Sequence, residues 1–485
     1  MGSVAHLKKW LYLGSGLYLA LMAVSYYFEF YYVALLPIAA LFFWLAIYRI
    51  EVLLILITLF TPFSVNLESL ELGGIGMYIP TEPLLFGVLL LFIFKALSGK
   101  SIDARIWKHP ITWIVFAYLL WIAITCISSE YPIVSIKFLL AKCWFIAAFY
   151  FLTIHVFRDL SKMKVFAMMY LFPLFLVIIY AVTRHAGFGF DKDSSHWVME
   201  PFFKDHTSYG AALALFLPML ASILLLRDHK LLLKIFLGIG AVILLTGLVL
   251  SYTRAAWLSV IGAGGILGVM TLRIPLRTFA FFIFLIGSFL YLARTDIEIA
   301  LEHNKQESSD NLEKHVSSIS NVSSDASNLE RLNRWNCAFE MFKERPVFGW
   351  GPGTYQFVYA PFQRSKDKTI ISTNEGDGGN AHSEYLGPLS EQGLPGMLIM
   401  IGLVMAISRL AFRLYYRIRD REIRLMILGS FLGLVTYFIH GALNNYLDTD
   451  KISVPFWTFI SMLVAIDLFY LPQDEDAATS SIGRT

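Results

Sequence analysis

The chain has 485 residues, of which 57% belong to the hydrophobic set and 15% are charged, and its mean hydropathy is +0.63. Soluble domains are about a quarter charged, so this composition excludes a disordered chain, a collagen-like chain and a secreted disulfide scaffold, and it indicates an integral membrane protein. The net charge of +3 gives no indication of nucleic acid as a partner, and the three cysteines make no disulfide framework.

Long apolar runs, separated by charged or Gly/Pro-rich breaks, predict an all-α, polytopic bundle of about 14 membrane-spanning helices. The runs lie near 10–27, 32–48, 51–63, 83–97, 110–127, 138–157, 165–183, 207–226, 231–250, 255–271, 278–293, 394–412, 425–443 and 453–471. Each run is continuously apolar and does not alternate, which excludes the strands of a membrane β-barrel.

The distribution of basic residues predicts the orientation. Segment 409–424 holds six arginines, which favours the cytoplasmic side. The other side then carries 17 of the 39 Lys and Arg, 10 of them in the long loop 294–385, which the positive-inside rule discounts. We therefore expect both termini in the cytoplasm and loop 294–385 outside. The predicted organisation is N-terminal spans over 1–293, this periplasmic loop, and C-terminal spans with a cytoplasmic tail over 386–485.

Within the long loop, Ser327 and Glu330 form a capping-box pattern and Pro346 ends the helix that follows. The helix has one apolar stripe and is expected to lie on the membrane surface or to pack on the bundle. The stripe consists of Leu329, Leu332, Trp335, Phe339 and Phe342. Arg331 and Arg334 are one turn apart, so they can project together toward a ligand or extend to lipid headgroups.

The end of the loop holds the strongest candidate for a general base. Segment 348–357 (FGWGPGTYQF) contains three glycines that permit tight turns near a ligand. Segment 378–396 (GGNAHSEYLGPLSEQGLPG) then places His382 and Glu384 before a short amphipathic stretch that is broken by prolines and glycines. Histidine accepts a proton near neutral pH, which suits general-base catalysis on a sugar hydroxyl.

Other cationic groups lie at the same membrane edge. Arg254 is in SYTRAAW, where two helices turn with almost no loop, and a charge so close to hydrocarbon is a functional candidate or a snorkelling anchor. Outer loop 184–206 adds Arg184, Lys204 and His206. Because arginine forks match phosphate oxygens, this surface predicts an anionic lipid head such as a lipid pyrophosphate as ligand.

Metal chemistry has weaker support in the sequence. The chain contains neither HExxH, nor paired CxxC, nor a calcium loop. Asp448 and Asp450 resemble the paired carboxylates that hold a divalent ion in many glycosyltransferases, although a short match of this kind on an exposed turn is most often a solvated turn. His440, at the outer end of its helix, is the main alternative to His382 as a base, and we expect it to pack in the bundle.

Taken together and in this order, SYTRAAW, NLERLNRWNCAFEMFKERPVFGWGPGTYQF and AHSEYLGPLSEQGLPG resemble the O-antigen ligase/polymerase superfamily over roughly residues 200–440. The resemblance implies a metal-independent glycosyltransferase of the GT-C type in the bacterial inner membrane, part of lipopolysaccharide biosynthesis, which takes a glycan from undecaprenyl pyrophosphate at the periplasmic face. The resemblance also implies that no cofactor is needed.

The resemblance also implies roles for particular residues. Arg254 matches the arginine at the family's hairpin turn, and Arg331, four residues before Trp335, matches that of its R-x-x-x-[LW] pattern. His382 matches the histidine of H-x-x-x-L…E-x-G. The arginines are then expected to hold the donor pyrophosphate, helped by Arg334 and Lys204, while His382 activates the acceptor hydroxyl. Glu384, Glu391 and His206 are supporting residues.

Two departures from the family pattern leave the acceptor open: Ser383 stands where family patterns often have Asn, and about 14 spans exceed the usual dozen or so. An inverting O-antigen ligase acting on lipid A–core is our first choice. A polymerase of O-antigen or exopolysaccharide and a protein O-oligosaccharyltransferase of the same superfamily are the alternatives. A lipid-linked glycan flippase is the alternative from another class, but transporters place their charges at mid-membrane between repeats.

Overall fold

The computed structural model describes residues 2–67, 76–98, 103–227, 230–275, 326–363 and 379–471, with isolated positions between 278 and 292. These ranges are mostly helical, which confirms a polytopic helical protein. The described strands are β1 (Val65–Asn66) and β2 (Tyr78–Ile79), which pair antiparallel with Val65 opposite Ile79.

The chain divides into two compact units, 1–53 and 54–485. The first unit holds α1 (Gly2–Tyr27), η1 (Tyr31–Leu35), α2 (Leu36–Tyr48) and the start of α3 (Ile50–Phe60). Many large apolar side chains of α1 and α2 are exposed, as helices that face hydrocarbon require.

The second unit is a helical bundle that contains every candidate site residue. Its elements are η2 (Thr61–Phe63), α4 (Thr81–Leu97), α5 (Ala104–Lys108), α6 (Pro110–Ile127), α7 (Pro132–Ile146), η4 (Ala147–Leu152), α8 (Thr153–Val156), α9 (Leu160–Ala186), η5 (Ser194–His196), α10 (His206–Leu224), α11 (Leu231–Leu250), α12 (Arg254–Thr271), α16 (Ala326–Glu344), α17 (Tyr355–Val358), η6 (Ala360–Phe362), α18 (Leu386–Arg417), α19 (Arg421–His440) and α20 (Asp450–Phe469).

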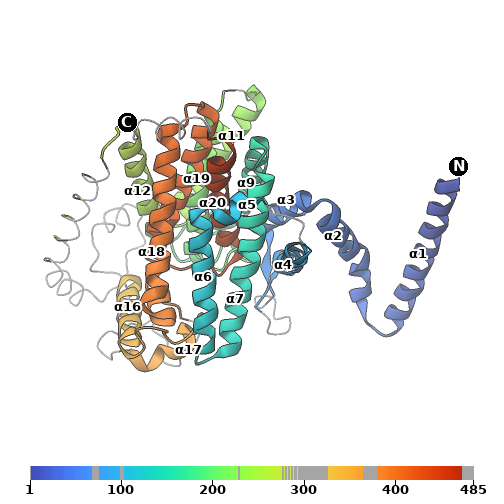
Figure 1. The fold of residues 1–485 in the computed structure, drawn as a ribbon, viewed down its shortest axis with the longest axis horizontal. Coiled ribbons are helices and arrows are strands. Elements are labelled where there is room, and N and C mark those ends of the chain that lie inside the picture. Colours follow the sequence, from blue (N-terminus) through green and yellow to red (C-terminus); the bar gives the residue numbers. More distant parts are fainter. Residues whose placement is uncertain are drawn as a thin grey trace, which may run out of the picture. The chain divides into compact units, whose positions relative to one another are not determined.

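The C-terminal helix α20 lies in the centre of the bundle. It is apolar on all sides, and 17 of its 20 residues are buried, which is the pattern of a helix surrounded by others. Helices α10 and α19 pack against each other beside it, and α18 packs on α6. Figure 1 shows α18, α6 and α7 running side by side, with α16 and α17 at one end of them.

Ten helical segments in the described part of the chain are long and apolar enough to cross a membrane. They are 31–48, 110–127, 132–156, 160–186, 206–224, 231–250, 254–271, 386–417, 421–440 and 450–469. The other predicted spans 10–27, 51–63 and 83–97 fall on α1, on α3 with η2, and on α4, while most of 278–293 lies outside the described residues. The count of 14 therefore stays a prediction.

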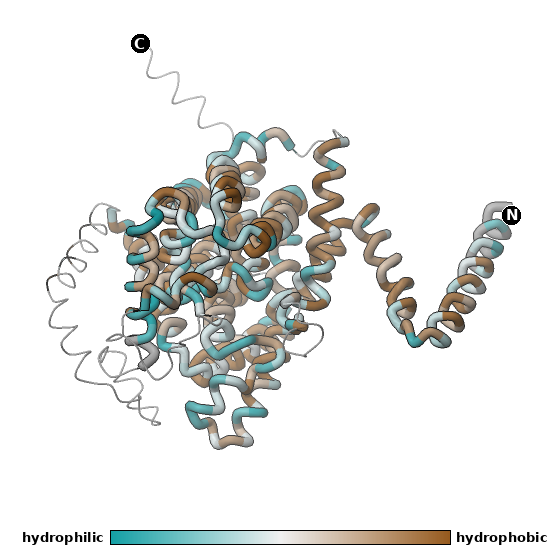
Figure 2. The backbone as a smooth tube through the Cα atoms, turned by 90° about the horizontal axis from the view of Figure 1, so that it is seen from below, coloured by the Kyte–Doolittle hydropathy of each residue, from teal (hydrophilic) through white to brown (hydrophobic). Residues whose placement is uncertain are grey.

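The bundle has two polar ends with an apolar middle. In Figure 2 the helices are largely brown and the teal colour gathers in the connections. The α16 end comprises α16, α17 and the connections 128–131, 187–205, 251–253 and 441–449. The other end, which contains the six arginines of segment 409–424, is called the arginine end. There Asp467 accepts a hydrogen bond from Arg413 at 2.6 Å and lies 3.1 Å from His109 Nε2.

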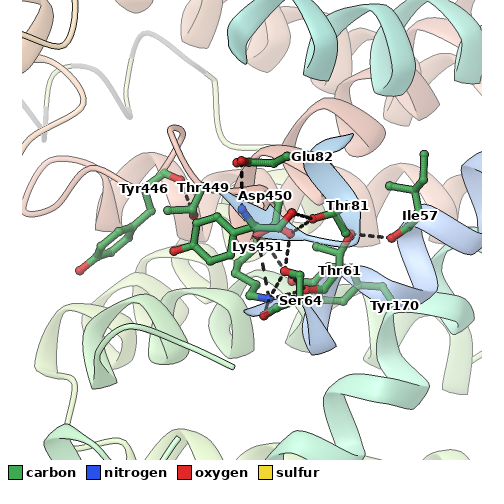
Figure 3. Close-up of polar contacts among 11 residues, drawn as sticks. Ile57, Thr61, Ser64, Thr81, Glu82, Tyr170, Tyr446, Thr449, Asp450 and Lys451 are labelled. Atoms are coloured by element: carbon green, nitrogen blue, oxygen red, sulfur yellow. Dashed lines mark hydrogen bonds and ion pairs between the residues drawn. The ribbon is translucent and has the colours of Figure 1, made fainter. Parts of the chain in front are cut away.

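A buried polar cluster fixes the start of α20 at the α16 end (Figure 3). The Oδ2 atom of Asp450 accepts hydrogen bonds from Ser64 at 2.5 Å and from Thr81 at 2.6 Å. The Nζ of Lys451 donates to the carbonyls of Thr61 at 2.5 Å and Ser64 at 2.7 Å. Because these bonds join η2 and α4 to α20, both charged residues have a structural role here.

Candidate functional site

Arg254 is positioned by the tight turn between α11 and α12. Only residues 251–253 separate the helices, as predicted. Thr253 Oγ1 donates to the carbonyl of His206 at 2.8 Å, and a Cβ on Gly210 would lie 2.8 Å from the Thr253 Cβ. The turn is thus packed against the start of α10, and it presents Arg254, partly buried, as the first residue of α12.

Helix α16 packs on the start of α18, but the face that it buries is not the predicted apolar stripe. Phe339 of that stripe is 45% exposed, and Leu332 and Trp335 are only partly buried. The small side chains Cys337 and Ala338 are fully buried instead, because they let the helix approach closely. The core around them consists of Met341, Tyr355, Val358, Tyr359 and Ala381.

The buried face of α16 also carries an ion pair. Arg334 Nε donates to Glu330 Oε1 at 2.6 Å, and the two residues are 4% and 5% exposed. The guanidinium lies 3.9 Å from the centre of the Tyr359 ring. Its Nη1 atom is buried with no hydrogen-bond partner among the described residues, so a donor of this group remains for a ligand or for another part of the chain.

Arg331 points from the same helix toward the loop after α19. Its Nε donates to the carbonyl of Leu443 at 3.2 Å. Burial lowers the pKa of Arg331 from its usual value, yet a guanidinium stays protonated at neutral pH. Arg331 and Arg254 act on each other electrostatically. The two arginines that the sequence singled out therefore belong to one region of positive charge.

His382 lies in the same electrostatic field. Its backbone has a positive φ of 46°, and its N–H donates to Asn380 Oδ1 at 3.0 Å. Burial and the positive charges of Arg331 and Arg334 lower the pKa of His382 to about 4. The imidazole is therefore neutral at pH 7 and has a lone pair that can accept a proton.

Ser383 fills the position where the family pattern often has Asn. Its Oγ accepts hydrogen bonds from the N–H groups of Tyr385 and Leu386, each at 3.3 Å. Both Ser and Asn cap helix N-termini in this way. Ser383 can therefore make the same kind of capping hydrogen bonds that an Asn could make at this position.

Glu384 holds the loop after α19 in place. Its Oε1 accepts hydrogen bonds from Tyr437 OH at 2.5 Å, Tyr446 N–H at 2.8 Å and Leu447 N–H at 2.9 Å. Burial raises the pKa of Glu384 above its ordinary value. Three donors on one oxygen indicate that Glu384 positions the loop, while its supporting role in the reaction stays a prediction.

Glu391 and Gly393, the E-x-G pair, hold the glycine-rich segment against α18. Glu391 Oε1 accepts from the Tyr355 N–H at 2.9 Å, and its carbonyl accepts from the Gly351 N–H at 2.8 Å. Gly393 has φ 71°, and a Cβ there would lie 2.2 Å from the Val347 carbonyl oxygen. A glycine is thus needed at position 393, where the backbone of α18 contacts that of Val347. Gly393 is also the predicted break in the helix.

The remaining candidates lie at the same end of the bundle in different settings. His206 opens α10 and stacks on His196 with ring centres 4.3 Å apart. Lys204 is exposed and lines a neighbouring cavity in which neither Arg254 nor Arg331 takes part. His440 is fully buried and lies 3.1 Å from Asn444, so it packs in the bundle as expected.

The two carboxylates once considered for a metal are separated in the structure. Asp450 belongs to the buried cluster described above, whereas the side chain of Asp448 is 53% exposed and lies 3.6 Å from Lys142 Nζ. Within the described ranges, His, Cys, Asp and Glu form no group of three that could hold a metal ion.

Two acidic residues of the site were missed by the sequence analysis. Glu330 and Asp205 both act electrostatically on His382 and partly oppose the arginines. Asp205 caps α10 by accepting from the Ser208 N–H at 2.7 Å. The spacing of Glu330 and Arg334, four residues apart, was a signal for the first, and the Asp-x-x-Ser pattern before an apolar run was a signal for the second.

Residues 239–401 match the family model described as O-Antigen ligase. The matched segment contains Arg254, Arg331, His382 and the Glu391–Gly393 pair. It supports the O-antigen ligase superfamily, so the resemblance seen in the sequence motifs is confirmed. A comparison with curated proteins finds no match.

Proposed function

We propose, from the match to the O-antigen ligase superfamily and from the geometry around His382, that the chain is a glycosyltransferase that moves a glycan from undecaprenyl pyrophosphate to an acceptor hydroxyl. The observation that carries the proposal is a neutral histidine in the field of Arg331 and Arg334, at the bundle end where Arg254 opens α12. This combination supplies a base and a binding site for a pyrophosphate leaving group in one place.

In the proposed reaction the acceptor oxygen attacks the anomeric carbon of the donor sugar. The bond from that carbon to the pyrophosphate oxygen breaks, and the electron pair leaves with the pyrophosphate. His382 Nδ1 or Nε2 takes the acceptor proton. One displacement inverts the anomeric configuration. Arg254 and Arg331 stabilise the negative charge that develops on the leaving group, with Arg334 in support.

The N-terminus of α12 strengthens the proposed pyrophosphate site. The first N–H groups of a helix have no intrahelical acceptor, and they carry a partial positive charge. Arg254 is the first residue of this helix, so its guanidinium and the helix end can act on the same anion. The side chain is held close to Arg331, where like charges in low dielectric favour an anion between them.

We propose that the acceptor is lipid A–core, since the matching family description names O-antigen ligases. The active site would then face the periplasm and the arginine end the cytoplasm, in the bacterial inner membrane. The six arginines of 409–424 support this orientation, because basic residues near short loops favour the cytoplasmic side.

The experiment is a lipopolysaccharide gel of a deletion strain of the source bacterium, complemented with wild type or His382→Ala. Bare lipid A–core, with polymer left on undecaprenyl pyrophosphate, is expected for His382→Ala. Core that carries a single repeat would indicate a polymerase instead. Full transfer by a correctly folded His382→Ala protein would overturn the assignment of the base.

A further inference from the structure

A cavity lies at the α16 end beside the His382 segment. Its volume is about 190 Å³, and its walls come from α6, α7, the turn before α17, residues 379–392 and the loop after α19. Ala381 and Ser383, the chain neighbours of His382, line it, whereas Arg254 and Arg331 do not. The cavity is smaller than the roughly 300–1,000 Å³ of pockets for drug-sized ligands, so it suits one small unit.

The charges in this cavity are balanced. Lys142 is 2% exposed, its Nζ donates to the Leu447 carbonyl at 2.6 Å, and it lies 3.6 Å from Asp448 Oδ1. The carboxylates of Glu384 and Glu391 are also in the wall. Lys204 lines the cavity as well, so two lysines face three carboxylates, and this nearly balanced wall fits a ligand that is neutral and polar.

Two wall residues carry unpaired hydrogen-bond acceptors. Gln392 is 1% exposed, and its Oε1 is buried without a hydrogen-bond partner among the described residues. The same holds for the Oδ1 atom of Asn445. Both residues line the cavity, together with the aromatic rings of Tyr118 and Phe138. A buried acceptor needs a hydrogen-bond donor. A sugar offers hydroxyl donors, and the apolar faces of its ring can pack on aromatic side chains.

We infer that this cavity binds one sugar unit of a glycan substrate, next to the base. The inference rests on the proposed function, since it places a substrate beside His382. The sugar belongs either to the acceptor, whose hydroxyl His382 would deprotonate, or to the glycan of the donor. Either sugar presents hydroxyl donors to Gln392 and Asn445. Steady-state kinetics with donor and acceptor varied separately distinguishes the two.

Gly387 offers a way to fill the cavity without disturbing the fold. It lines the cavity in the first turn of α18, and a Cβ placed on it meets only the Ala381 Cβ, at 3.9 Å. Gly387→Ala should therefore be tolerated, while the longer side chain of Gly387→Met should occupy the sugar position. Gly402→Met is the matched control, because Gly402 is on the same helix, does not line the cavity and has nothing within 4 Å of an added Cβ.

The first measurement is steady-state transfer by the full-length protein in proteoliposomes, with donor and acceptor varied separately. Gly387→Met and Asn445→Leu should each raise the KM for one glycan substrate by about tenfold, the effect of losing one or two hydrogen bonds. A higher acceptor KM assigns the cavity to the acceptor, and a higher donor KM to the donor glycan. Gly402→Met should match wild type.

The second measurement is binding without turnover. The core oligosaccharide and the O-antigen repeat, each released from its lipid, are titrated into the protein in nanodiscs. His382→Ala should bind as wild type does, and Gly387→Met should lose binding. If wild type binds a sugar this way but transfers none, the proposed function is wrong and the cavity assignment stands. If wild type transfers glycan and both cavity variants equal it in KM and binding, the cavity assignment is overturned.

Discussion

Glu330 and Arg334 form a buried ion pair across one turn of α16, with 2.6 Å between Oε1 and Nε. The pair holds the arginine within the electrostatic field of His382, and both charges act on that histidine. A buried arginine without its carboxylate would be an uncompensated charge. The pair therefore links the stability of α16 to the charge of the site.

We expect Glu330→Gln to lower the free energy of unfolding by about 3 kcal/mol, because it leaves Arg334 buried and unpaired. Glu340→Gln is the matched control on the same helix. Glu340 pairs with Lys343 at 3.0 Å, but the lysine side chain is 65% exposed, so the loss there should stay below about 1 kcal/mol. Thermal unfolding in detergent measures the loss in each variant. Equal losses would mean that the buried pair stabilises the fold no more than the exposed pair does.

The pH dependence of transfer should report His382 directly. The base works only when it is neutral, and burial with Arg331 and Arg334 lowers its pKa to about 4. In wild type kcat/KM should therefore be lost only as the pH falls through about 4. Arg331→Gln removes one of the charges that lower this pKa, so the acid limb should move to higher pH.

The control for this shift is Arg345→Gln. Arg345 follows α16 and pairs with Glu130 at 2.9 Å, but it is not among the groups that shift His382. Its acid limb should coincide with that of wild type. If the acid limb of kcat/KM in Arg331→Gln stays where it is in wild type, a group other than His382 is responsible for that limb.

Gly393 should be the glycine of α18 that is least tolerant of substitution. Its φ of 71° and the Val347 carbonyl oxygen, 2.2 Å from an added Cβ, both oppose a side chain. We expect Gly393→Ala to lower the free energy of unfolding by at least about 1–3 kcal/mol, and to release the segment that Glu391 holds. Gly402→Ala on the same helix should stay near wild type. Limited proteolysis of the 346–355 segment and the unfolding temperature test this, and an unchanged Gly393→Ala would contradict the assigned contact.

Much of the fold could be predicted from the sequence because membrane helices depend on local composition. Runs such as 231–250 and 255–271 are visible without any tertiary information, and α11 and α12 follow them within one residue. Short segments were harder to predict. The stretch 51–63 is too short to decide by hydropathy, and it forms α3 with η2.

The site was harder to predict, since its geometry depends on contacts between distant segments. His382 and Arg331 could be named from motifs, but the bond from Arg331 to the Leu443 carbonyl joins residues 112 apart. The apolar stripe of α16 was visible, yet the buried face follows the small residues Cys337 and Ala338. Periodicity reports which side chains are apolar, and it does not report which face meets a neighbour of fitting shape.

The guanidinium geometry of Arg254 gives the sharpest test of the proposed leaving-group site. An arginine fork makes paired hydrogen bonds to phosphate oxygens, while a lysine keeps the charge without the fork. We expect Arg254→Gln to lower kcat by about 10²–10³, the loss typical of one donor that stabilises transition-state charge, and Arg254→Lys to fall between. Chelation by EDTA should leave wild-type transfer unchanged, because in the proposed mechanism the arginines take the role of a metal ion.

The control for Arg254 is Arg184→Gln. Arg184 lies in the last turn of α9 at the α16 end, but its Nη1 donates to the Glu200 carbonyl at 3.0 Å and its guanidinium lies over the Trp197 ring. Its kcat should equal that of wild type. If Arg254→Gln alters only the KM for the donor and leaves kcat intact, Arg254 binds the ground state without stabilising the leaving group. If EDTA abolishes transfer and Mg²⁺ restores it, a metal ion shares that role, and the arginines are donor-binding residues rather than its replacement.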